Sequence, residues 1–136
     1  MILASRTWSR ALLFITGVYW AIIFTLTHLP PRKLPQVNIW DKLEHFLAYG
    51  LLGGLLYVTL WILRPRTQRL WLIVLAIGMA YGAIDEWLQI PVGRDCSIRD
   101  WSADVLGVGV AVGVLTLVRQ LTHNSQHTSH KESTAI

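Results

Sequence analysis

Residues 70–90 read LWLIVLAIGMAYGAIDEWLQI, and this stretch decides the fold. It is apolar along almost its whole length and has the roughly 20 residues that an α-helix needs to cross a bilayer. Its only charges, Asp85 and Glu86, come near its end. A carboxylate inside such a span costs a few kcal/mol unless it is paired or hydrated, and intramembrane charges usually mark function. The stretch therefore predicts a membrane-spanning helix with a polar site toward one end.

Three further apolar runs, residues 11–29, 43–63 and 101–118, have the same character, and prolines or charged turns separate them. Of the 136 residues, 53% are hydrophobic and 15% charged, whereas soluble domains carry about 25% charged residues. We therefore predict an all-α bundle of four transmembrane helices. Residues 11–118 form the membrane domain, residues 1–10 precede it, and the polar segment 119–136 is expected to be disordered.

Lysine and arginine indicate the orientation. With a cytoplasmic N-terminus, seven of the 12 basic residues lie inside, and three of them crowd the short turn 64–69. Cytoplasmic loops carry such an excess, so both termini are expected to be cytoplasmic and the loops 30–40 and 91–100 to lie outside. The net charge of +4 comes from residues at the ends of apolar runs. It therefore predicts membrane topology and no nucleic-acid partner.

Seven of the eight acidic residues fall in three places. These are Asp41 and Glu44; Asp85 and Glu86; and Asp95, Asp100 and Asp104. In four antiparallel spans, all three places lie on the same membrane face, whichever way the protein is oriented. The helical period also aligns Asp85 with small residues of its own span, which directs its side chain toward the bundle.

We predict a ligand site at this face, and its candidate residues are drawn from all three places and the loop between the last two spans. They are Asp41, His45, Tyr49, Asp85, Glu86, Gln89, Arg94, Arg99, Asp100 and Asp104. Negative charge is unfavourable at a helix C-terminus, so Asp85 and Glu86 are expected to pair with Arg94 and Arg99. A purely structural ion-pair network stays open as the alternative.

Simpler roles exist for some of these residues. Asp41 with Glu44, and Ser97 with Asp100, match the spacing of helix N-terminal capping boxes. His45 among carboxylates has the chemistry of a zinc or manganese site. However, the sequence lacks a compact metal motif such as H-E-x-x-H, and nothing identifies a base beside Cys96 or Ser97. We therefore predict no metal, no cofactor and no residue for nucleophilic catalysis.

Three G-x-x-x-G spacings occur, at Gly50/Gly54, Gly78/Gly82 and Gly109/Gly113. Such spacing lets membrane helices approach closely, either within one chain or between copies. The expected partners are therefore membrane lipid and a second copy of the chain.

The polar motifs together resemble the VanZ-like family. The residues that carry the resemblance are the run Asp41-Lys42-Leu43-Glu44-His45-Phe46 with Tyr49 and Gly50, then Asp85-Glu86 with Gln89, Arg94, Asp100, Asp104 and Gly107, and the segment 25–30. The resemblance covers about residues 15–115. Family members often carry Asn where this chain has Asp104, which adds a negative charge to the site.

Membership would imply a small protein of the bacterial cytoplasmic membrane with an envelope role. The family is named for a protein associated with resistance to the glycopeptide teicoplanin. We accordingly expect a protein that binds an envelope lipid, a glycopeptide or an envelope partner at the outer face, rather than an enzyme. The alternatives are an enzyme acting on a lipid-linked or phosphate-bearing substrate, and a small oligomeric transporter.

Overall fold

The computed structural model describes residues 2–29, 38–94 and 96–134. The described elements are α1 (Ile2–Thr27), α2 (Asn38–Leu63), α3 (Leu70–Gln89), the 3-10 turn η1 (Ile90–Val92) and α4 (Ile98–Thr134). Within these residues there is no strand, and four helices are long and apolar enough to cross a membrane. The all-α architecture of a multi-pass membrane protein is therefore confirmed.

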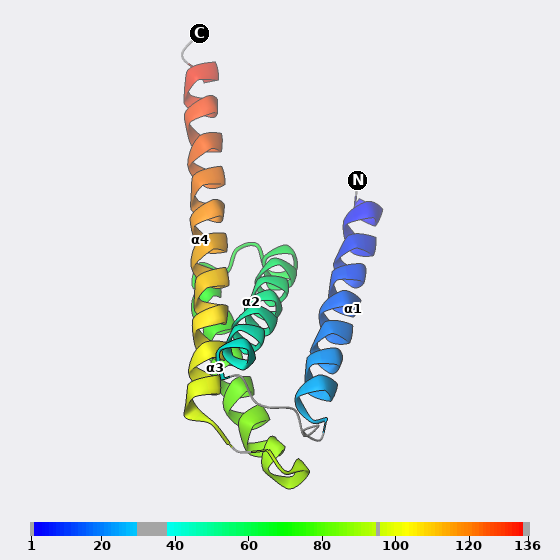
Figure 1. Ribbon diagram of the computed structural model, residues 1–136. Coiled ribbons are helices and arrows are strands. Elements are labelled where there is room, and N and C mark those ends of the chain that lie inside the picture. The colour runs from blue at the N-terminus through cyan, green and yellow to red at the C-terminus, as the bar shows by residue number, and fades with distance from the viewer. Residues whose placement is uncertain (1, 30–37, 95, 135–136) are drawn as a thin grey trace.

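The apolar spans lie where the hydropathy of the sequence puts them, at Thr7–Thr27, Lys42–Leu63, Leu70–Val92 and Ile98–Thr122. The helices themselves extend further. In particular, α4 continues to Thr134, through most of the segment expected to be disordered. Figure 1 shows α4 rising past the other helices, with both ends of the chain on the side of the α2–α3 turn.

Helices α2 and α4 cross at very short distance because glycines face each other there. A Cβ on Gly107 would collide with the carbonyl oxygen of Phe46, and one on Gly50 would lie 3.3 Å from the Gly107 carbonyl oxygen. On α3, a Cβ on Gly78 would lie 2.8 Å from Cγ2 of the fully buried Val108. Small residues therefore let α4 pack against both α2 and α3.

The three predicted G-x-x-x-G pairs differ in what they contact. Gly50, Gly78 and Gly82 all lie at close contacts within the chain. By contrast, a Cβ on Gly109 or Gly113 would meet nothing within 4 Å among the described residues. Two of the predicted spacings thus serve the fold of the single chain.

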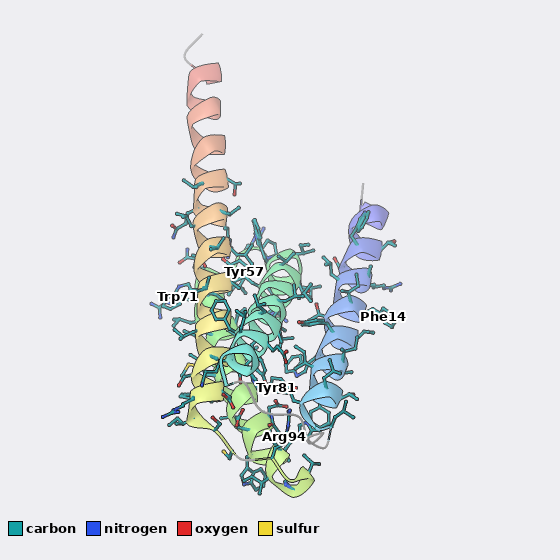
Figure 2. All side chains as sticks on the ribbon, in the orientation of Figure 1. Phe14, Tyr57, Trp71, Tyr81 and Arg94 are labelled. Atoms are coloured by element: carbon teal, nitrogen blue, oxygen red, sulfur yellow. The ribbon has the colours of Figure 1, made fainter. Side chains whose placement is uncertain are left out.

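Helix α1 contacts the bundle through Ile23, which is buried in the apolar core, and through hydrogen bonds. Thr16 and Thr59 share a hydrogen bond of 2.9 Å between their hydroxyls, and the Tyr19 hydroxyl donates to the Ala48 carbonyl at 3.1 Å. Much of the remaining α1 surface is apolar and exposed, and Figure 2 shows Phe14 pointing away from the other helices. Such a surface contacts lipid in a membrane.

Candidate functional site

A histidine–aspartate pair joins α2 to α4 at the end of the bundle opposite the α2–α3 turn. Nδ1 of His45 lies 2.9 Å from Oδ1 of Asp104, and the two residues are 8% and 0% exposed. His45 precedes Gly50 by five residues, and Asp104 precedes Gly107 by three. The close helix crossing at those glycines therefore brings the imidazole and the carboxylate into contact.

Glu86 of α3 completes a group of three buried residues from three helices. His45, Glu86 and Asp104 each offer one metal-ligating atom, and these atoms lie within 4.8 Å of one another. Oε2 of Glu86 accepts the backbone N–H of Ser97 at 2.7 Å. Among the described residues, Oε1 of Glu86 and Oδ2 of Asp104 have no hydrogen-bond partner. We call His45, Glu86 and Asp104 the buried triad.

Gly82 leaves room beside the triad. A Cβ at this position would lie 3.3 Å from Oδ2 of Asp104 and 3.2 Å from Cδ1 of Trp101. The glycine of the predicted α3 stripe therefore borders the unpartnered oxygen directly.

Asp85 lies beside the triad but has its own partners. Its Oδ1 accepts the Thr27 hydroxyl at 3.0 Å, and its Oδ2 accepts the Gln89 side-chain amide at 3.2 Å. Nδ1 of His28 lies 3.7 Å from Oδ1. Both oxygens of this fully buried carboxylate therefore have partners. In Glu86 and Asp104, by contrast, only one of the two oxygens has a partner.

The expected pairing of Asp85 and Glu86 with Arg94 and Arg99 is wrong for the described residues. Nη1 of Arg94 instead donates to the Thr27 carbonyl oxygen at 2.9 Å, at the end of α1, where Figure 2 shows it. The last carbonyls of a helix lack partners within it, so they compete with carboxylates for a guanidinium. Arg99 is exposed on the first turn of α4.

A partly open pocket of about 160 Å³ lies between α1 and α2, in front of the triad. Its lining combines apolar side chains with charged ones from α2 and the loop before α4. The lining residues are Ile23, Leu26, Thr27, Glu44, His45, Ala48, Tyr49 and Arg94. His45 is thus the member of the buried triad that forms part of the pocket wall.

A row of aromatic rings packs inward from His45. Tyr49 stacks between His45 and Tyr81, with ring centroids 6.3 Å and 5.6 Å apart. The hydroxyls of both tyrosines are buried near the Asp85 carboxylate, although neither forms a hydrogen bond of standard geometry among the described residues. These two rings therefore place their hydroxyls on the same side of the bundle as Asp85.

Most of the predicted site residues do come together. His45, Tyr49, Asp85, Glu86, Gln89 and Asp104 are buried at one end of the bundle, and Arg94 lies at the pocket. Asp100 lies in the first turn of α4, where its backbone N–H is 3.3 Å from the Ser97 hydroxyl, as the capping hypothesis predicts. The side chain of Asp41 and the whole of Asp95 lie outside the described residues.

Two contributors were missed by the sequence reasoning. Thr27 bonds Asp85 through its hydroxyl and Arg94 through its carbonyl, so it links α1 to the site. Its only sequence signal is its place in the segment 25–30. Tyr81 precedes Asp85 by one helical turn, and that spacing could have added it to the polar stripe on α3.

Comparison with known proteins gives one informative similarity. Over 88 residues, covering 61% of this chain, the sequence is 32% identical to human phosphatidylserine synthase 2. The matched part spans 17% of that protein's length. No family model matches the sequence, and no solved structure matches it.

Proposed function

We propose that this protein is a membrane enzyme that acts at the phosphate of a lipid headgroup. The observation that carries the proposal is the buried His45–Asp104 pair, placed with its imidazole in the wall of a pocket between two membrane-spanning helices. A lipid can reach such a pocket from the bilayer.

The pair has the arrangement that general base catalysis needs. Asp104 holds the imidazole of His45 at 2.9 Å, and a carboxylate in that position fixes the ring and stabilises its protonated form. A neutral His45 would accept the proton of an attacking hydroxyl. General base catalysis of this kind contributes about 10²–10⁴-fold to a rate.

Arg94 and the apolar side chains of the pocket could bind the phosphate and the apolar part of a phospholipid, respectively. One of the guanidinium N–H groups of Arg94 is used on the Thr27 carbonyl. An arginine has five, and these match phosphate oxygens well. Ile23, Leu26 and Ala48 provide apolar surface beside it. The volume of about 160 Å³ is below the roughly 300 Å³ of common ligand pockets, so it suits a headgroup better than a whole glycopeptide.

The similarity to phosphatidylserine synthase 2 supports the same class of reaction, because the name of that protein describes an enzyme that makes a phospholipid. The reaction class we propose is attack of a hydroxyl oxygen on the lipid phosphorus. The headgroup alcohol leaves and takes up a proton, so that one phosphate ester replaces another or is hydrolysed.

Binding without catalysis is the second candidate, and the convergence of the VanZ-like motif residues favours it. His45, Asp85, Gln89 and Asp104 all carry that resemblance, and all are buried at one end of the bundle. In this proposal the protein binds an envelope lipid in the bacterial cytoplasmic membrane, and glycopeptide resistance follows from that binding. The open surface at Gly109 and Gly113 is then the proposed contact between copies.

The test uses the full chain reconstituted into vesicles of phosphatidylethanolamine, phosphatidylglycerol and phosphatidylserine, with headgroup release and exchange followed by mass spectrometry. We expect turnover of at least one lipid. His45→Gln should lower it by about 10²-fold or more, and Arg94→Gln should lower it because the phosphate loses its cation.

Arg99→Gln is the matched control for Arg94→Gln, since it removes the same positive charge outside the pocket. Asp100→Asn is a second control, a polar change on α4 outside the pocket. Both should keep the parent activity. If the parent binds lipid without turning it over, and only Arg94→Gln loses that binding, the protein is a lipid-binding protein and the enzyme proposal is wrong. Equal activity in all four variants, with normal amounts of folded protein, would refute the site.

We further propose that the pocket faces the outside of the cell, as the arginine-rich turn 64–69 indicates. Cys96 is exposed near the pocket end of the bundle, so it reports the orientation. An impermeant thiol reagent should label it in intact cells. Labelling only after permeabilisation would place the pocket on the cytoplasmic side.

A further inference from the structure

We propose that the buried triad of His45, Glu86 and Asp104 binds one divalent metal cation of the Mn²⁺ or Zn²⁺ type. The inference does not depend on the proposed lipid chemistry, because the binding of a metal ion can be measured without any substrate.

The first argument is the convergence of the ligand atoms. Three helices supply one imidazole and two carboxylates, and one ligand atom from each lies within 4.8 Å of the others. Adjacent ligands on an octahedral ion at about 2.1 Å are roughly 3 Å apart. Nδ1 of His45 and Oδ1 of Asp104 already lie 2.9 Å apart. Small side-chain rotations would bring the group to such an ion.

The second argument is independent of the first and concerns atoms that lack partners. Oε1 of Glu86 and Oδ2 of Asp104 are buried without a hydrogen bond among the described residues, and the two residues are 3% and 0% exposed. Carboxylate oxygens in that state are costly to bury. A cation between them would satisfy both.

The third argument is the charge of the site. Ion pairs of the buried aspartates are to histidines: Asp104 pairs with His45, and Asp85 lies near His28. Neither Arg94 nor Arg99 forms an ion pair with these carboxylates. Both oxygens of Asp85 accept hydrogen bonds, whereas Glu86 and Asp104 each have one oxygen that accepts none among the described residues. A metal ion would thus belong at the triad and not at Asp85.

The donor set indicates the kind of metal. Imidazole nitrogen suits zinc and other transition metals, and carboxylate oxygen suits manganese, magnesium and calcium, so the mixed set favours Zn²⁺ or Mn²⁺. Three protein ligands leave coordination positions for water or substrate, as in catalytic sites. If this cation is bound, His45 would hold it together with Glu86 and Asp104, and the cation would supply the activation of a hydroxyl group.

The experiment measures Mn²⁺ and Zn²⁺ binding to the purified full chain in detergent after chelator treatment. Histidines 123, 127 and 130 of the tail also attract zinc, so all three are first replaced by glutamine, and this protein serves as the parent. We expect one ion per chain and a higher midpoint of thermal unfolding with metal than without it. Electron spin resonance of the Mn²⁺ form should show a coupled imidazole nitrogen.

Glu86→Gln and Asp104→Asn should each weaken binding by at least about tenfold, and His45→Gln should abolish the nitrogen coupling. Asp85→Asn is the matched control, a buried carboxylate next to Glu86 that lies outside the triad. It should bind metal as the parent does. The proposal is overturned if the parent binds neither ion at millimolar concentration, or if Asp85→Asn loses binding while the triad variants keep it. Because the parent is tested directly, poor folding of a variant cannot hide either outcome.

Discussion

The two ends of the bundle treat their polar groups differently. At the end near the α2–α3 turn, the Thr116 hydroxyl donates to Tyr57 at 3.2 Å. Arg119 donates from Nη2 to the Pro65 carbonyl at 2.6 Å and from Nη1 to Thr67 at 3.0 Å, with its guanidinium 5.7 Å from the Trp61 ring. Every one of these groups has a structural partner.

The buried atoms that lack a hydrogen bond among the described residues lie at the pocket end. Within the residues that the structure describes, five buried side-chain atoms lack a hydrogen bond. They belong to His28, Tyr49, Tyr81, Glu86 and Asp104. The same chain therefore satisfies its buried polar groups where they serve the fold and leaves them open at one end. Because unpartnered buried groups are uncommon in folded proteins, the difference supports the ligand site proposed above.

The largest effect on stability is expected at the helix crossing that supports the pocket end. Gly107→Ala places a methyl group against the Phe46 carbonyl oxygen, so it should lower the free energy of unfolding by about 1–3 kcal/mol. Thermal or denaturant unfolding in detergent measures this loss.

Gly109→Ala is the control for that change, since its Cβ would meet nothing within 4 Å. Alanine is the better helix former, so this variant should gain up to about 1 kcal/mol. Equal losses in both variants would show that the crossing of α2 and α4 is not the tight contact described above.

A smaller effect is expected at the opposite end, where polar groups serve only the fold. Thr16→Val or Thr59→Val should each cost about 0.6 kcal/mol, the average for a hydrogen bond between membrane helices. The double variant should cost less than the sum, because it leaves no hydroxyl unpaired. The same unfolding assay measures all three. Strict additivity would mean that the two hydroxyls do not form the bond.

The helices could be predicted because hydropathy and proline mark spans such as 70–90 without any tertiary information. The convergence of His45, Asp85 and Asp104 could also be predicted, since antiparallel spans bring those ends to one face. The hydrogen-bond partner of each carboxylate could not be predicted from the sequence. Whether Asp85 meets Arg94 or Thr27 depends on helix rotation and on the loop path, which the sequence period does not determine.

The buried triad is a second feature that could not be predicted from the sequence. His45, Glu86 and Asp104 lie on three helices, so no spacing within the sequence brings them together. A metal motif on one helix is visible as a pattern, whereas a site between helices depends on the crossing at Gly50 and Gly107. The prediction of no metal was based on spacing alone, and it stays a prediction; the structure adds that three possible ligand residues lie together.

The central claim is that the two carboxylates of the buried triad, Glu86 and Asp104, are kept for a ligand and not for stability. The most direct test is the free energy of unfolding of Asp104→Asn against the parent, in detergent with a metal chelator. Asparagine can keep the contact with His45 and removes a buried charge, so the account predicts equal or higher stability. A loss of about 3–5 kcal/mol, the cost of breaking a buried structural ion pair, would contradict it.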